Sequence, residues 1–493
     1  MLNSKLTDKG YEVSISPNGS TRIPSVTLAE LSTTLLARDN FPGFAYCSDP
    51  TVMDYVKSTG TQWKKGDGTV VSSDPALPGT STNILRFSSP TNRTPNNKRV
   101  NSTSTVQRMV TRVPHYIGSG DQFELRPVLN NWCQWLGSTD LPGNTQTVYN
   151  TFMELPGVST KRCTYDGGAN GTILIDGQDD KVGDPITPAA FGLAKFTQGT
   201  LYYMRHEVEV PAGGTFMSVD TFDANSSGGH VFDPAVTQCT NIGGSGDLQY
   251  NGAVTFTSLL VVPLMIGKFV SGDPVTWFFV GDSITNGVGD TLSNGRGKGY
   301  AGRALAGSDW ATSIAGCNAS KPNGQAAAWS SRMAKLCKYA NNHWEAFGPN
   351  NFDNTPNADP STVGYVLDLS RAIWQSCKDS ASTVPGATPQ RTFRMKMLPR
   401  TDAPTGTTEA SQSVYGGATG KWRYPNGNAV DFNSRLASEP LIYKVISFDS
   451  FTRSTTELDK WKYGTDNTID GTHPGSNNGH IEMGATARSA IAA

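Results

Sequence analysis

The sequence has few charged residues and no block of like charge. Lys and Arg number 41 against 42 Asp and Glu in 493 residues, so the net charge is −1, and charged residues make up only 17% of the chain. A nucleic-acid-binding protein usually carries a basic face, and this balance gives no sign of one, so we expect no nucleic-acid partner. The composition, rich in Gly, Pro, Ser, Thr and Asn, favours many short strands joined by turns.

Long apolar runs and paired metal-binding motifs are also missing. The apolar run Leu259–Ile266 is too short to cross a bilayer, so we expect no membrane span. The seven cysteines are scattered without a CxxC pair, which predicts free and mostly buried thiols. His206 and Glu207 lack the second histidine of HExxH, and we expect neither a metal nor a cofactor. The first residues contain no apolar signal segment, which predicts synthesis in a cytoplasm.

Residues 1–106 are predicted to form a small N-terminal attachment region that ends in a linker. Ser25–Ala37 has the pattern of one helix, and Tyr55–Val71 reads as a hairpin that turns at Lys65–Gly68. Residues 72–106 consist mainly of Ser, Thr, Pro and Asn, which bury little apolar surface. We therefore predict a linker or a long surface loop there.

Residues 107–271 contain only strand and turn patterns. Leu201–Val210 alternates apolar with charged residues, as a half-buried antiparallel strand does. His206 falls on its apolar face and is interpreted as a core or interface histidine. Several short strands without long helices predict a β-sandwich or jelly-roll domain. Trp132 and Trp135 have two open interpretations, core packing or stacking on sugar rings.

From residue 272 onward, predicted strands alternate with helices. A continuous apolar run such as Val275–Val280 is typical of a strand covered on both faces. Helices are predicted from Pro360 and over Gly479–Ala493. The five predicted strands are Val275–Val280, Trp310–Ala315, His343–Phe347, Thr392–Leu398 and Leu441–Phe448. This alternation predicts an α/β domain over residues 272–493 with a doubly wound, flavodoxin-like, five-stranded parallel sheet, whose ligand site lies beyond the carboxyl ends of its strands.

Two polar motifs lie near the ends of this predicted domain. Gly281–Gly287 (GDSITNG) puts Ser283 at the carboxyl end of the first strand, where glycines allow a tight turn. A serine hydroxyl needs a base to become a nucleophile. Asp470–Pro474 (DGTHP) carries a carboxylate and an imidazole three residues apart, so Asp470 can hold His473 in the tautomer that accepts the serine proton.

Hydrogen-bond donors for a developing oxyanion are expected after the next two strands. Gly316 follows the second strand and Asn350 follows the third. The backbone amides of Ser283 and Gly316 and the side-chain amide of Asn350 are therefore candidate donors. His480, at the start of the last helix, is interpreted as a structural residue rather than a second base.

The four motifs, taken together, resemble those of a known family. GDS after a buried first strand, glycine after the second, GxN after the third and DxxH near the end are similar to the motifs of the SGNH hydrolases, also called GDSL esterases. The resemblance covers residues 273–493 and implies a serine esterase. The residues that it implies for catalysis are the nucleophile Ser283, the triad partners Asp470 and His473, and the oxyanion donors Ser283, Gly316 and Asn350.

The sequence departs from the family's pattern at the third motif. This motif often reads GxND, and Asn351 here replaces the acid, so Asn354 and Asn318 stay open as donors in place of Asn350. Residues 401–428 look like an insertion near the site, which either shapes the substrate cleft or forms a surface loop.

The resemblance and the small polar residues of the site loops predict a carbohydrate esterase that removes O-acetyl groups from a polysaccharide. A β-rich part before the parallel sheet, and a Ser/Thr/Asn-rich start, also resemble tail-fibre or tailspike proteins of bacteriophages. We therefore expect a virion protein that acts on an acetylated bacterial surface polysaccharide, either capsule or O-antigen. It is expected to bind other virion proteins through its N-terminal region and, as a spike or fibre, to assemble as a homotrimer. Two alternatives stay open: a structural or adhesive virion protein with a vestigial or glycan-binding SGNH domain, and a lipase or thioesterase that cleaves small acyl esters.

Overall fold

The computed structural model divides the chain into two compact units, which we describe separately. One comprises residues 1–81 and 270–272, and the other residues 82–269 and 273–493. The structure describes residues 84–492 with ten gaps, and five strands within the first 83 residues. The gaps are 136–140, 221–226, 271, 292–297, 306–309, 323–331, 353–359, 403–408, 416–420 and 463–466.

The smaller unit contains a five-stranded sheet in the order β1-β2-β3-β4-β5. Its strands are β1 (Ser25–Val26), β2 (Phe44–Cys47), β3 (Asp54–Ser58), β4 (Gln62–Lys65) and β5 (Val70–Ser73). The turn predicted at Lys65–Gly68 falls between β4 and β5, but β3 pairs with β4 as well, so the segment has three strands rather than one hairpin. The predicted helix over Ser25–Ala37 is wrong at its start, because β1 pairs with β2; residues 27–37 lie outside the described residues.

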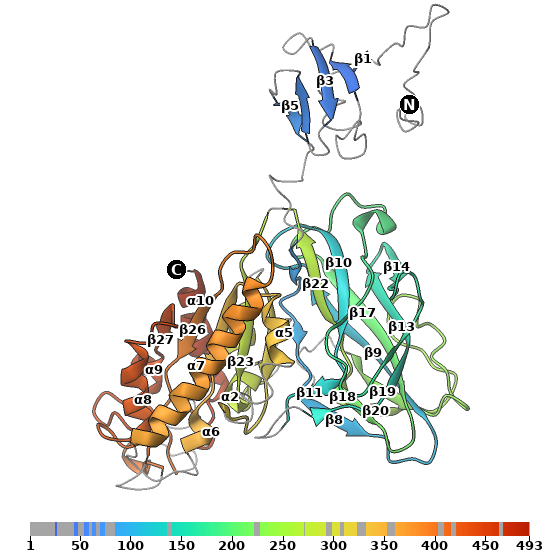
Figure 1. The fold of residues 1–493 in the computed structure, drawn as a ribbon. Coiled ribbons are helices and arrows are strands. Elements are labelled where there is room, and N and C mark those ends of the chain that lie inside the picture. The colour runs from blue at the N-terminus through green and yellow to red at the C-terminus, as the bar shows by residue number, and fades with distance from the viewer. Residues whose placement is uncertain are drawn as a thin grey trace, which may run out of the picture. The chain divides into compact units, whose positions relative to one another are not determined.

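The larger unit contains a six-stranded sheet in which every neighbouring pair is parallel (Figure 1). Its order is β27-β26-β25-β23-β24-β7. The strands are β23 (Thr276–Gly281), β24 (Ala311–Gly316), β25 (Asn342–Ala346), β26 (Arg391–Met395), β27 (Lys444–Ile446) and β7 (Asn92–Arg93). The first five are the predicted strands in the flavodoxin-like order, and β7 is an addition that the sequence did not predict.

Helices cover both faces of this sheet. Phe278 and Val280 pack with α5 (Met333–Cys337), α7 (Pro360–Ser382) and α8 (Asn428–Leu436). Trp277 and Phe279 point the other way, toward α3 (Gly299–Leu305) and α10 (Ile481–Ala492). The shorter elements are α2 (Ser283–Asn286), α6 (Pro349–Phe352), α9 (Asp449–Thr452), a 3-10 turn at Glu409–Ser411 and a π-helical turn at Ser476–His480. Among the residues described, no helix is long and apolar enough to cross a membrane.

Apart from β7, the strands of residues 84–269 form sheets that are antiparallel within themselves. A seven-stranded sheet contains β14 (Ser159–Arg162), β13 (Gln146–Leu155), β17 (Leu201–Val210), β9 (Gln107–Tyr116), β19 (Ser227–Phe232), β20 (Thr255–Thr257) and β15 (Thr172–Leu174). A four-stranded sheet contains β16 (Lys181–Val182), β10 (Gln122–Leu129), β22 (Leu264–Phe269) and β6 (Arg86–Phe87). The smaller sheets contain β21 (Leu259–Leu260), β18 (Thr215–Asp220) and β8 (Asn97–Val100), and β11 (Trp132–Cys133) and β12 (Leu141–Pro142). A 3-10 turn spans Pro188–Phe191.

The two larger antiparallel sheets pack face to face. Leu125 and Met265 of the four-stranded sheet share one hydrophobic cluster with Met153 and Met204 of the seven-stranded sheet. Apolar residues from both inner faces therefore form a common core. The jelly-roll topology itself stays a prediction, as does the division of the chain after residues 106 and 271.

Strand β17 has the predicted bounds, but its charged face is covered. Arg205 is fully buried, pairs with Glu154 at 2.8 Å and donates to backbone carbonyls of residues 241–246. The expectation of a half-buried strand is wrong on this face, because opposite charges and backbone acceptors satisfy the guanidinium away from water. On the other face, His206 is a core histidine as predicted, and burial lowers its pKa to about 3.

Residues 84–100 belong to the folded core, which corrects the linker prediction for this segment. Phe87 packs against Phe278 with ring centroids 5.9 Å apart. Arg86, fully buried, pairs with Asp273 at 2.6 Å. The segment is polar, but ion pairing and strand pairing satisfy its polar groups, so low hydrophobicity did not signal a linker. A single hydrophobic cluster consequently joins the antiparallel sheets to the parallel one.

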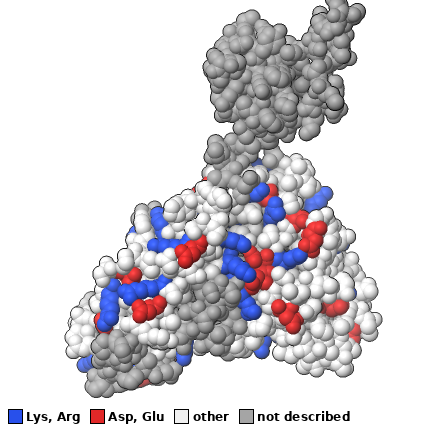
Figure 2. Space-filling model, in the orientation of Figure 1, with Lys and Arg blue, Asp and Glu red and all other residues white. Residues whose placement is uncertain are grey.

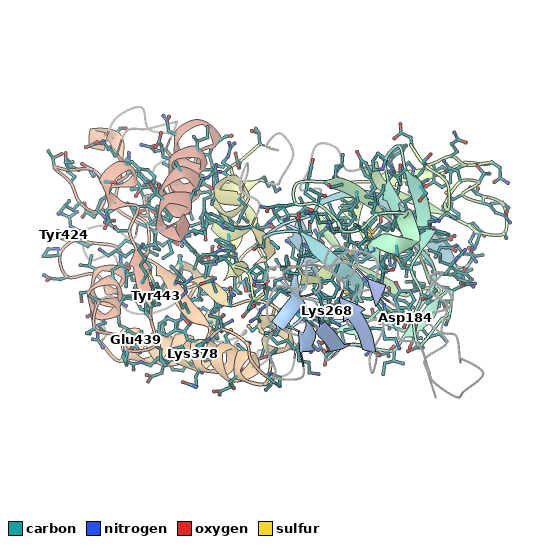
Figure 3. The ribbon with its side chains drawn as sticks, turned by 90° about the horizontal axis from the view of Figure 1, so that it is seen from above. Asp184, Lys268, Lys378, Tyr424, Glu439 and Tyr443 are labelled. Carbon is teal, nitrogen blue, oxygen red and sulfur yellow. The ribbon has the colours of Figure 1, made fainter. Side chains whose placement is uncertain are left out.

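Two further views show this arrangement and its surface. Seen from above in Figure 3, Glu439 and Tyr443 lie in the α/β part, whereas Lys268 and Asp184 lie among the antiparallel strands beside it. Figure 2 shows Lys and Arg interspersed with Asp and Glu over the visible face, with no large area of one sign. Positive and negative side chains, which are nearly equal in number in the sequence, are thus also evenly mixed on this face.

Candidate active site

The turn that carries Ser283 begins where β23 ends. Gly281 must be glycine, because a Cβ there would overlap the Thr285 side chain. Asp282 caps the one-turn helix α2 by accepting a hydrogen bond from the Ile284 amide at 3.0 Å. Ser283 is the first residue of α2, so its backbone amide has no acceptor within the helix. The sequence therefore places both the hydroxyl and the amide of Ser283 at the carboxyl edge of the sheet.

The structure brings Ser283, His473 and Asp470 into one hydrogen-bonded row. His473 Nε2 lies 2.9 Å from Ser283 Oγ, and His473 Nδ1 lies 2.6 Å from Asp470 Oδ2. A carboxylate only accepts, so Nδ1 carries the proton and Nε2 is left to accept one from the serine. The backbone amides of Thr472 and His473 donate to the other carboxylate oxygen at 2.9 and 2.8 Å.

This row lies at the protein surface. The Asp470 side chain is 46% exposed and the His473 side chain 19%. Partial burial opposes the charged form of Asp470, but hydrogen bonds from the His473 amide and ring and from the Thr472 amide outweigh it and lower the pKa of Asp470. The carboxylate therefore stays ionised next to the imidazole, while solvent and ligands have access to the row.

The loop that carries Asp470 and His473 is supported from behind. The carbonyl oxygen of Gly471 accepts from Trp461 Nε1 at 2.8 Å and from the Thr401 amide at 2.9 Å. Gly471 has a φ of +82°, and a Cβ would overlap Thr401. The first residue of the predicted insertion 401–428 thus contacts this loop; residues 403–408 and 416–420 lie outside the described residues.

A second set of contacts joins the chain after Ser283 to the chain after His473. Asp290 accepts from Arg303 at 2.6 Å and from Ser476 at 2.7 Å. His480 Nε2 lies 3.0 Å from the carbonyl oxygen of Val288, which only accepts, so this nitrogen carries the proton. His480 is fully buried and has the structural role predicted for it.

The candidate oxyanion donors lie on two neighbouring loops. Gly316 ends β24 beside Gly281, and a Cβ on it would overlap the backbone of Asn286. The structure therefore sets Gly316 directly against α2. Asn350, in α6, donates one amide N–H to the carbonyl oxygen of Ser320 at 3.1 Å. Of the two alternatives to Asn350, Asn318 is exposed, and position 354 lies outside the described residues.

Sequence reasoning missed two residues from the β-rich part that reach these loops. Asn96 donates to the carbonyl oxygen of Gly316 at 2.7 Å. Gln134 donates to the Ser320 hydroxyl at 3.0 Å. Asn96 lies in the segment predicted to be a linker, and no local pattern in an Asn- and Thr-rich stretch marks one amide among several as buried.

The two tryptophans near this region differ in exposure. Trp132 is fully buried in the shared hydrophobic cluster, so the core interpretation holds for it. Trp135 is half-buried, and the Lys98 ammonium lies 4.8 Å from its ring centroid. Stacking of a sugar on Trp135 stays a hypothesis.

Most of the cysteine side chains that the structure describes are buried. Of the six cysteines whose side chains are described, five are buried, among them Cys317 next to Gly316. Within the described ranges, no group of three or more His, Cys, Asp or Glu side chains could hold a metal ion.

Asp282 provides a test of the environment beneath the serine. Its carboxyl group is 1% exposed, and burial raises its pKa from 3.8 to about 6. The folded state therefore holds this proton more tightly than the unfolded state, and the wild type loses stability as pH rises from about 4 to about 6. Asp282→Asn keeps an acceptor for Ile284 but does not titrate. We expect the free energy of unfolding of the variant to rise relative to the wild type by roughly 2 kcal/mol between pH 4 and pH 7, measured by urea denaturation.

Asp449→Asn is the control with the opposite sign. Burial opposes the charge on Asp449, but Arg453 outweighs it and lowers the pKa of this carboxyl group. Its stabilising effect is present above its unfolded pKa and is lost as pH falls, so this variant should lose stability relative to the wild type as pH rises. If the free energy of unfolding of Asp282→Asn and of the wild type changed with pH in parallel, the pKa of Asp282 would be the same in the folded and unfolded states, which would contradict this prediction.

Comparison with known proteins gives remote structural likenesses only. No protein-family model matches the chain, and no curated protein sequence does. The similar solved structures include a member of the lipolytic protein G-D-S-L family from Veillonella parvula (16% identity, 44% of this chain and 97% of that chain, TM-score 0.28). They also include a GDSL-like lipase from Bacteroides thetaiotaomicron (14% identity, 44% of this chain and 87% of that chain, TM-score 0.29). A lipase from a goat rumen metagenome is similar as well (13% identity, 44% of this chain and 97% of that chain, TM-score 0.30). At these identities and TM-scores, the function of the site has to be inferred from its own geometry.

Proposed function

We propose that residues 272–493 form a serine esterase of the SGNH hydrolase type, with Ser283 as nucleophile. The row from Ser283 Oγ through His473 to Asp470, with distances of 2.9 and 2.6 Å, supports this proposal most directly. A nucleophile, a base and a group that orients the base are what ester cleavage through an acyl-enzyme requires. The GDSL lipolytic proteins among the similar structures agree in kind with this assignment.

In the proposed reaction, His473 Nε2 takes the proton of Ser283 as Oγ attacks the ester carbonyl carbon. Asp470 stabilises the imidazolium that forms. His473 then gives this proton to the departing alcohol oxygen, and the acyl group stays on Ser283. A water molecule gives a proton to His473 and attacks the acyl carbon, which releases the carboxylic acid and returns the proton to Ser283 Oγ.

The negative charge on the carbonyl oxygen needs donors close to Ser283. We propose the backbone amides of Ser283 and Gly316 and the side-chain amide of Asn350. The Ser283 amide begins α2, Gly316 lies against α2, and Asn350 retains one N–H beyond the one that Ser320 accepts. Each such donor lowers the barrier by roughly 3 kcal/mol in serine hydrolases.

We further propose that the substrate is an O-acetylated polysaccharide of a bacterial surface, cleaved by a bacteriophage virion protein. The row is open to solvent, and amide side chains such as Asn318 lie near it, which suits sugar hydroxyls better than a long acyl chain. Gln134 of the β-rich part, itself fully buried, donates to Ser320 in a loop of the site, so this part lies directly behind the loop. In this proposal, the N-terminal region binds other virion proteins and the protein assembles as a trimer.

Replacing the nucleophile separates an enzyme from an adhesive protein. Ser283→Ala removes the hydroxyl and leaves the loop, so kcat/KM for p-nitrophenyl acetate should fall at least about 10³-fold, with an unchanged melting temperature. Ser438→Ala, an exposed serine after α8, is the matched control and should keep wild-type activity. Equal rates for Ser283→Ala and the wild type would leave the structural or adhesive alternative.

The orientation of the base is tested by Asp470→Asn. The asparagine oxygen can still accept from the Thr472 and His473 amides, so its NH₂ group must face Nδ1 of His473. Nδ1 then accepts, the proton moves to Nε2, and the imidazole cannot take the serine proton. We expect kcat to fall roughly 10⁴-fold while KM changes little. Asp431→Asn on α8 is the control, and a loss below tenfold for Asp470→Asn would contradict the orienting role.

Acetate release identifies the substrate class. The wild type should liberate acetate from O-acetylated capsule or O-antigen polysaccharide, followed by NMR, and Ser283→Ala should not. If no glycan yields acetate while p-nitrophenyl butyrate and octanoate are cleaved in a Ser283-dependent manner, the lipase alternative replaces the polysaccharide proposal.

A further inference from the structure

Three asparagine side chains from distant parts of the chain form a hydrogen-bonded row beside Ser283. Asn96 lies between β7 and β8, Asn286 ends α2, and Asn318 follows β24. The Asn96 amide nitrogen donates to Gly316 O at 2.7 Å and to Asn286 Oδ1 at 2.8 Å. The Asn286 amide nitrogen in turn donates to Asn318 Oδ1 at 3.1 Å.

A backbone carbonyl fixes the direction of this row. The carbonyl oxygen of Gly316 can only accept, so the group of Asn96 that faces it must be NH₂. That NH₂ group also faces Asn286, which therefore presents its oxygen to Asn96 and its nitrogen to Asn318. Asn318 must then receive this bond on its oxygen, and its own NH₂ group points away from the row.

The loop that carries Asn318 is held on both sides. Ser320 is fully buried; its hydroxyl accepts from Gln134 at 3.0 Å and its carbonyl oxygen from Asn350 at 3.1 Å. Ala319 has a φ of +56°, a left-handed conformation that a residue with a Cβ adopts only where its surroundings impose it. The position of Asn318 is therefore set by the fold and not by the loop alone.

Asn318 lies near the nucleophile and is exposed. Ser283 and Asn286 are three residues apart in one helical turn, a spacing that brings Cβ atoms to roughly 5–6 Å, and Asn318 is one hydrogen bond further. Within the described ranges, the structure gives the Asn318 NH₂ group no acceptor. An oriented donor at the rim of the site is thus available to a ligand.

We infer that Asn318 binds the substrate, donating its amide N–H to an oxygen of an ester such as an acetylated sugar, and that Asn96 and Asn286 are positioning residues for it. The inference rests on the proposed esterase function. It adds to that function a donor outside the three proposed for the oxyanion. It also gives Asn96, a residue that precedes the α/β part, a role in positioning the Asn318 side chain for the substrate.

The first test replaces the donor itself. Asn318→Ala removes the amide and Asn318→Asp turns a donor into an acceptor of the same shape; kcat and KM are measured with p-nitrophenyl acetate and glucose pentaacetate. We expect kcat/KM to fall about 3- to 10-fold for both variants on at least one substrate, as the loss of one hydrogen bond implies. Unchanged values on both substrates would overturn the inference. Loss of the Ser283 dependence of hydrolysis would overturn the esterase proposal instead.

The second test asks whether Asn96 acts through Asn318. Asn96→Ala should lower kcat/KM by a similar factor, and Asn96→Ala/Asn318→Ala should be no slower than Asn318→Ala alone. Melting temperatures of all variants separate this coupling from a loss of stability. Asn97→Ala is the matched control, since Asn97 binds Asp220 at 3.0 Å and not the catalytic loop, and it should keep wild-type kinetics. Multiplicative losses in the double variant, or an unaffected Asn96→Ala, would contradict a positioning role for Asn96.

Discussion

The 2.9 Å contact between His473 Nε2 and Ser283 Oγ joins residues 190 positions apart, and the geometry of the site depends on it. A parallel sheet makes such a meeting possible because the carboxyl ends of its strands share one edge. The edge alone does not fix two loops to a few tenths of an ångström. The Asp290–Ser476 hydrogen bond ties the chain after the serine to the chain after the histidine, and Thr401 supports the Asp470–His473 loop from behind.

The serine turn is held in a different way, by residues that precede the α/β part. β7 lengthens the parallel sheet next to β24, and Asn96 then donates to Gly316 at the end of that strand. Buried Arg86 pairs with Asp273, and a shared hydrophobic cluster underlies both contacts. Burial of an ion pair is costly unless both partners are present, so the antiparallel and parallel parts depend on each other for stability. An α/β part cut out at residue 272 would lose a strand and an anchor of its catalytic loop.

The sequence predicted the features that neighbouring residues in the chain determine, and it missed those that depend on a partner far away in the chain. The apolar run of β23 and the alternation of strands with helices after it predicted the five parallel strands, although β25 and β26 also bury polar residues. The site motifs are local as well, so the sequence alone predicts Ser283, Asp470 and His473 as the site residues. The two-residue strand β7 has no such signal, since its partner β24 supplies the pairing. The covered face of β17 was missed for a related reason: Arg205 appears suited to solvent until Glu154, 51 residues away, neutralises it.

Buried charged side chains lie close to Asp282, the residue before Ser283, whereas the side chains of the asparagine row beside Ser283 are neutral amides. Near the buried Asp282 carboxyl group, Arg394 and Glu345 are fully buried and pair at 2.6 Å, so these two cancel each other's charge. Beside Ser283, the neutral amides of Asn96, Asn286 and Asn318 orient one another through hydrogen bonds. A carboxylate in place of one of these amides would favour the protonated imidazole of His473, which cannot accept the serine proton. Amides can therefore orient the loop and the substrate while Asp470 remains the group that governs the proton of His473.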